Sequence, residues 1–125
     1  MKFGIFYEHQ LPRPWQEDSE YRLLQQSLEQ IELADQLGFD YAWEVEHHFL
    51  EEYSHSSAPE VFLAAASQRT KNIRLGHGII QLTTNHPARV AERVSTLDLL
   101  SDGRVEFGIG EGSSVTELHP FDRRF

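Results

Sequence analysis

Cysteine is absent from this 125-residue chain, which excludes disulfide frameworks, thiolate zinc sites and cysteine nucleophiles. Basic charge is scarce: 11 Lys and Arg stand against 20 Asp and Glu, a formal net charge of −9, whereas a nucleic-acid interface needs a basic face. No uncharged apolar run approaches the length of a membrane span or of a signal-peptide core. These absences predict a cytoplasmic protein with neither a nucleic-acid nor a membrane partner.

The chain does have enough apolar residues for a core. Its hydrophobic content is 39%, which argues against disorder and favours one folded domain. The acidic charge is uneven: residues 1–60 hold 13 acids against 3 bases, while residues 61–125 hold 7 against 8. An anionic ligand would therefore be better tolerated by the second half of the chain.

Strand and helix signals alternate along the sequence. Short apolar runs predict strands over residues 3–7, 39–45, 73–80 and 105–110. A helix is predicted after Asp18 or Ser19, because one apolar face recurs at helical spacing and Gly38 follows as its end. The spacing of Ser57 and Glu60 matches a capping box and predicts a helix from Ala58 to about residue 68. Pro87 opens a third helix, and the tail from residue 111 shows no periodicity.

This βαβαβαβ order predicts an α/β fold with a parallel sheet and its helices outside. Neither a G-x-G-x-x-G fingerprint nor a phosphate-binding Walker loop follows the first strand, which favours a (β/α)8 TIM barrel over a doubly wound sheet. A typical barrel has about 250 residues. Residues 1–125 are therefore predicted to form the N-terminal half of a barrel, truncated after the fourth strand.

In such barrels the active site lies at the carboxyl ends of the strands, where His9, His47, His48 and His86 are expected. The triplet Glu46–His48 is the most concentrated group, and a histidine there could act as a general base near neutral pH. A metal site is disfavoured, since consecutive residues on an extended segment point to opposite sides. A serine nucleophile is disfavoured too, because the adjacent serines at 113 and 114 lie outside any G-x-S-x-G elbow.

The sequence resembles the bacterial luciferase-like flavin-dependent monooxygenases over nearly its whole length. The resemblance is carried by Met1-Lys2-Phe3-Gly4, Leu37-Gly38-Phe39-Asp40, Glu46-His47-His48-Phe49, residues 64–71, Ile73-Arg74-Leu75-Gly76, His86-Pro87 and residues 101–108. It implies a (β/α)8 barrel that uses reduced FMN and O2 to oxygenate a small organic substrate. Deazaflavin-dependent reductases share this fold and are similar in this part.

Carried over by position, the resemblance makes His47 the catalytic histidine beside the flavin, with Glu46 and His48 in the same pocket. Gly78-Ile79 matches a non-prolyl cis peptide bond beneath the flavin ring, and Gly110 matches a position near its reactive carbon. Glu111 departs from the family, which has an arginine near the cofactor phosphate. A carboxylate there would repel that phosphate.

The resemblance also implies partners. The helices that start near Ala58 and Pro87 match those through which luciferases dimerise, and a flavin reductase would supply reduced flavin. The 125-residue piece alone is expected to be inactive. The alternative to an enzyme is a non-catalytic half-barrel that self-associates through its unpaired edge strands.

Overall fold

A computed structural model describes residues 1–121 of the chain. Its centre is a four-stranded parallel sheet in the order β1-β2-β3-β4. In chain order the elements are β1 (Gly4–Tyr7), α1 (Ser19–Gln36), β2 (Tyr41–Glu44), α2 (Pro59–Arg69), β3 (Arg74–Gln81), α3 (Pro87–Leu100), β4 (Val105–Gly110), α4 (Val115–Leu118) and the 3-10 helix η1 (His119–Phe121). The predicted parallel βαβαβαβ unit is confirmed.

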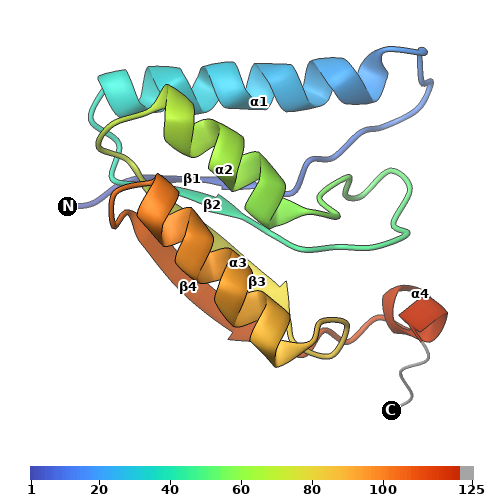
Figure 1. Cartoon of the computed structure of the whole chain (residues 1–125). Coiled ribbons are helices and arrows are strands. Elements are labelled where there is room, and N and C mark those ends of the chain that lie inside the picture. Colours follow the sequence, from blue (N-terminus) through green and yellow to red (C-terminus); the bar gives the residue numbers. More distant parts are fainter. Residues whose placement is uncertain (122–125) are drawn as a thin grey trace.

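Helices α1, α2 and α3 all cover the same face of the sheet (Figure 1). The core lies between the helices and this face, because alternate strand residues point toward the helices. Its buried side chains are Tyr7, Leu28, Ile31, Ala34, Ala42, Phe62, Leu63, Ala66, Ile73, Leu75 and Leu97. Among residues 1–121, no helix is both long and apolar enough to cross a membrane.

No element of residues 1–121 covers the opposite face of the sheet (Figure 1). That face carries the aromatic side chains of Phe6, Tyr41 and Trp43. Phe6 is 56% exposed there, and Trp43 stacks on Tyr41 with 5.8 Å between ring centroids. The ring of Trp43 also lies across Gly76, where a Cβ atom would collide with it. Gly76 thus makes room for a neighbouring side chain.

The predicted capping box at the start of α2 is wrong. Ala58 is the N-cap residue, and no side chain caps the helix. The Glu60 carboxylate instead accepts a hydrogen bond from Nη1 of Arg93, on α3, at 2.7 Å. A contact between two helices has replaced the local cap that the spacing suggested.

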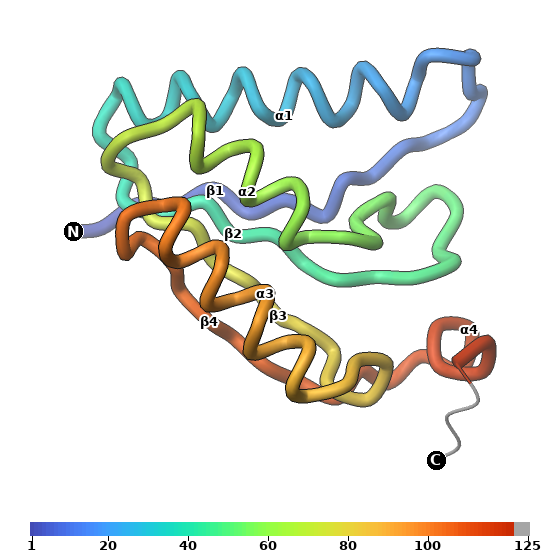
Figure 2. The backbone as a smooth tube through the Cα atoms, viewed as in Figure 1, coloured from blue at the N-terminus to red at the C-terminus, as the bar shows by residue number. Residues whose placement is uncertain are grey.

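The tail that lacks periodicity nevertheless forms regular structure. After β4 the chain turns into α4 and η1, which lie near the end of the molecule toward which the strands point (Figure 2). The loop between β2 and α2 extends to the same end. This shared position brings residues from both segments into contact.

Candidate active site

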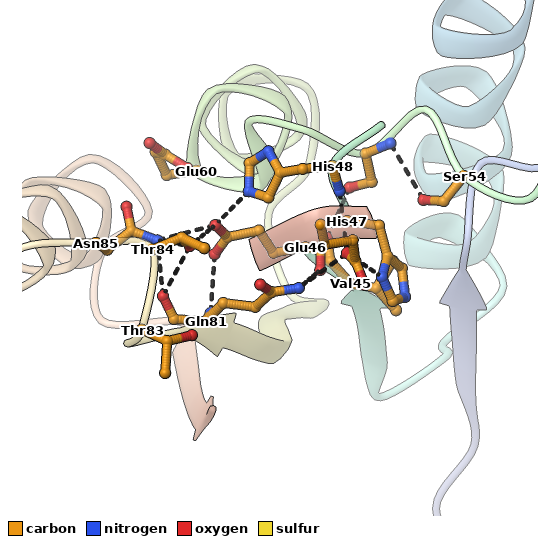
Figure 3. Close-up of polar contacts among 12 residues, drawn as sticks. Val45, Glu46, His47, His48, Ser54, Glu60, Gln81, Thr83, Thr84 and Asn85 are labelled. Atoms are coloured by element: carbon orange, nitrogen blue, oxygen red, sulfur yellow. Dashed lines mark hydrogen bonds and ion pairs between the residues drawn. The ribbon is translucent and has the colours of Figure 1, made fainter. Parts of the chain in front are cut away.

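Polar side chains from the loop after β2, from the end of β3 and from α4 meet at the carboxyl edge of the sheet (Figure 3). The predicted pair His47 and His48 lies within this group, as does Glu46. Strand β2 ends at Glu44, so the chain places these three residues directly beyond the sheet. The structure thus brings the predicted triplet to the position where barrels carry their active sites.

The imidazole of His47 is held between two carboxylates. Its Nδ1 atom lies 2.8 Å from Oε1 of Glu117, and its Nε2 atom lies 3.4 Å from Oε2 of Glu8. Because a carboxylate only accepts hydrogen bonds, the contact with Glu117 places the ring proton on Nδ1. With its side chain 24% exposed, His47 can exchange a proton with a bound molecule through Nε2.

Glu117 organises the site although the sequence analysis did not identify it. Its Oε1 atom accepts from Nδ1 of His47, from the backbone N–H of His48 at 3.0 Å and from Nε2 of Gln81 at 3.0 Å. The residue is only 3% exposed. Three donors on one buried oxygen stabilise the carboxylate and fix the histidine beside it.

Gln81, the last residue of β3, is the second residue that the sequence analysis missed. Its backbone N–H donates to Oε2 of Glu46 at 2.9 Å, and its Nε2 atom also donates to the carbonyl of Glu46 at 3.0 Å. Its side chain therefore links Glu46 with Glu117. Gly112 has φ of +72°, and a Cβ atom there would come within 3.0 Å of the Gln81 amide oxygen.

Glu46 accepts a second group of hydrogen bonds, which Gln81 joins to those of Glu117. Its Oε1 atom lies 2.8 Å from Nε2 of His48 and accepts from Nδ2 of Asn85 at 2.8 Å (Figure 3). Burial alone would raise the pKa of Glu46, but the bonds from His48, the Gln81 N–H and Asn85 outweigh it and hold the pKa below its ordinary value. Glu46 is therefore an anion that orients His48.

The two glycine positions differ in what surrounds them. A Cβ atom on Gly78 would make only ordinary contact, 3.4 Å from the ring of Phe6, whereas one on Gly110 would come within 2.8 Å of Ile79. The Gly78-Ile79 peptide bond is cis. A Cβ atom at position 110 would therefore force the Ile79 side chain to move, whereas the backbone at Gly78 is accessible on the aromatic face of the sheet.

The remaining predicted histidines do not join the site. His86 is the N-cap of α3, where its Nδ1 atom accepts from the N–H of Ala88 at 3.2 Å. His9 is 3% exposed and lies against Phe62 on α2, with 4.7 Å between ring centroids. Within residues 1–121 no three His, Asp or Glu side chains are grouped so that they could hold a metal ion.

Comparison with known proteins places this site in a family. The family model described as luciferase-like monooxygenase matches residues 1–125. Limonene 1,2-monooxygenase of Rhodococcus erythropolis is 41% identical over 129 residues, which is 98% of this chain and 32% of that protein.

Two solved structures share the fold. The oxygenating constituent of 3,6-diketocamphane monooxygenase from Pseudomonas putida, in complex with FMN, gives a TM-score of 0.90 at 24% identity, covering 99% of this chain and 33% of that one. The coenzyme F420-dependent tetrahydromethanopterin reductase of Methanopyrus kandleri gives 0.67 at 32% identity, covering 92% and 28%. The chain spans about a third of the length of these proteins. By its sequence along the whole length and by its fold, the chain belongs to the luciferase-like monooxygenase family.

Proposed function

We propose that the protein is a flavin-dependent monooxygenase that uses reduced FMN and O2 on a small organic substrate. The observation that carries this proposal is His47, a partly exposed imidazole whose Nδ1 atom is fixed by buried Glu117, which leaves Nε2, beside Glu8, to move a proton. Such a group suits general acid-base work beside a redox cofactor. Family membership supports the same chemistry.

The residues around the sheet edge fit the ring of a flavin better than its phosphate. Gly78 has no side chain and lies beside the half-exposed ring of Phe6, so a planar group could lie against the Gly78-Ile79 backbone. We propose that Gly78, Ile79 and Gly110 contact the ring and that His47 faces it, with Glu46 and His48 completing the pocket. When bound, reduced flavin supplies the electrons that activate O2.

The alternative cofactor is a deazaflavin, and the protein would then be a reductase. Exposed Glu111 follows β4 directly, and its carboxylate would repel a phosphate placed there. The F420-dependent reductase with this fold shows that the architecture also serves a deazaflavin. We place FMN first because the family model and limonene 1,2-monooxygenase are described as monooxygenases and not as reductases.

We further propose a homodimer formed through α2 and α3. A groove of about 490 Å³ between these helices is lined in part by Val61, Ala64, Leu97 and Leu100. Val61 is 66% exposed and Leu100 is 52% exposed, so the groove offers apolar surface to a second copy. We also propose that a flavin reductase supplies the reduced flavin and that the protein is located in the cytoplasm.

The test is a substitution of His47 in the protein expressed from its complete coding region. His47→Asn should lower substrate oxygenation by about 10²–10⁴-fold, the usual contribution of a positioned acid-base group, while FMN affinity changes little. Oxygen consumption and flavin fluorescence titration measure the two quantities. Unchanged turnover in the variant would remove His47 from the reaction. Tight binding of F420 in place of FMN would favour the reductase.

A further inference from the structure

Three buried polar side chains form a second group near the loop that carries His47. His9 is 3% exposed, Glu44 1% and Ser56 2%. Nδ1 of His9 lies 3.1 Å from Oε1 of Glu44, and the hydroxyl of Ser56 donates to the same oxygen at 2.7 Å. Burial of polar groups is unfavourable unless they interact, so a cluster this completely buried needs a reason.

The cluster is connected to the backbone of the loop that carries His47. The carbonyl of Ser56 accepts from the N–H of His47 at 2.8 Å, and the hydroxyl of Ser56 lies 2.7 Å from the carbonyl of Val45. The carbonyl of His9 accepts from the N–H of His55 at 2.9 Å. Both ends of the loop are thus fixed to the cluster, and the fixed positions include His47 itself.

His9 adopts a backbone conformation that few residues other than glycine accept. Its φ angle is +51°, in the left-handed region. The surroundings hold it there through the bond from the His55 N–H to its carbonyl, the close approach of its Nδ1 atom to Glu44 and its ring contact with Phe62. Strained backbone of this kind persists where the structure needs a particular geometry, often next to a functional site.

We propose that His9, Glu44 and Ser56 are positioning residues that hold the backbone of His47 so that its Nδ1 atom stays on Glu117. The proposal rests on the proposed role of His47. All three are almost completely buried, and they act through the loop. Ser56 is the central member, because it alone contacts both Glu44 and the N–H of His47.

The test measures His47 directly and needs no cofactor. In the ¹⁵N-histidine-labelled protein, NMR reports which ring nitrogen of His47 carries the proton, and hydrogen exchange reports the protection of its backbone N–H. Ser56→Ala and Glu44→Gln should reduce the fraction of His47 protonated at Nδ1 and should speed exchange of its N–H by about tenfold. Ser67→Ala is the matched control, since Ser67 is also 3% exposed and donates to a backbone carbonyl, that of Ala64, at 2.7 Å.

The outcomes separate positioning from ordinary packing. If Ser56→Ala and Ser67→Ala lower thermal stability alike and neither changes the ring signals of His47, the proposal is wrong. If the variants fail to fold, hydrogen exchange in the wild-type protein still tests the proposal. Rapid exchange of the His47 backbone N–H would contradict its bond to the Ser56 carbonyl. If His47→Asn loses activity but Ser56→Ala leaves the ring signals and the N–H exchange of His47 unchanged, only the positioning role is overturned. Normal activity in His47→Asn would overturn the proposed function instead.

Discussion

Oε1 of Glu117 lies 2.8 Å from Nδ1 of His47, although the two residues are 70 positions apart in the sequence. The contact joins the loop after β2 to the helix after β4 across the edge of the sheet. It sets the tautomer of His47 and leaves Nε2 on the side of Glu8, whose Oε2 atom lies 3.4 Å away.

Glu117→Gln tests this contact. A neutral amide can present its NH₂ group to His47, which favours the other tautomer, so we expect turnover to fall by less than the roughly 10²–10⁴-fold loss for removing the imidazole. Steady-state oxygenation by the protein from its complete coding region measures the effect, and Glu29→Gln on the exposed surface of α1 is the control. Equal turnover in the Glu117 variant and the wild type would show that the tautomer does not matter.

Glu111→Arg tests the position of the cofactor phosphate. An arginine there should pair with the phosphate of FMN and raise its affinity by about tenfold, as expected for one charge-assisted hydrogen bond. Riboflavin, which has no phosphate, should bind as before. Fluorescence quenching gives both affinities, with Glu29→Arg on the exposed surface of α1 as a control for the change in net charge. An equal gain for riboflavin would place the phosphate elsewhere.

His77 makes stability depend on pH. It is fully buried on β3, and burial lowers its pKa from 6.5 to about 4 despite the opposing charges of Glu60 and Glu46. Between pH 6.5 and about pH 4 the unfolded chain binds a proton at His77 that the folded chain does not bind. The free energy of unfolding therefore falls as the pH drops through this window. Below about pH 4 His77 is protonated in both states, and its contribution no longer changes with pH.

The His77→Leu variant isolates this contribution. The difference in unfolding free energy between the variant and the wild type should shift in favour of the variant as the pH falls. The shift should reach up to about 3 kcal/mol from about pH 7.5 to about pH 4. Urea denaturation at a series of pH values measures the difference. His119→Leu, at an exposed position, should leave the pH dependence nearly unchanged. A constant difference between His77→Leu and wild type across the series would mean that His77 titrates normally when folded.

Val61→Asp tests the proposed dimer. A charge in the groove between α2 and α3 would be buried by a second copy, so we expect the variant to be monomeric at concentrations where the wild type is dimeric. Light scattering after size exclusion measures the mass. Val115→Asp is the control, because Val115 is equally exposed, at 66%, but lies on α4. Dimers that persist in Val61→Asp would show that the interface lies elsewhere.

Apolar runs predicted the strands, and apolar residues at helical spacing, with turn and cap residues, predicted the three long helices. The alternating order of strands and helices then predicted a parallel sheet. The fourth strand forms over the predicted residues, and α1 buries Leu28, Ile31 and Ala34 as its pattern indicates. These features depend on residues close together in the sequence. The capping box at Ser57 failed because Glu60 has a stronger partner, Arg93, on another helix.

The candidate site was predictable only in part. His47 and His48 were found because they follow a strand and have titratable rings. Glu117 was missed because its helix, α4, is a single turn that no periodic pattern can reveal. Gln81 was missed because an uncharged amide gives no chemical signal in a sequence, although it bonds to both Glu46 and Glu117.

Because Trp43 lies across Gly76, its indole is an intrinsic fluorescent probe of the aromatic face of the sheet. The chain has only two tryptophans, and Trp15 lies in the loop before α1, where its ring contacts His55. After Trp15→Phe, the remaining indole emission would come entirely from the aromatic face of the sheet. The wavelength and intensity of this emission would then depend on how far water reaches the indole of Trp43. A flavin bound on that face would quench the emission by energy transfer, so its binding could be measured without a label.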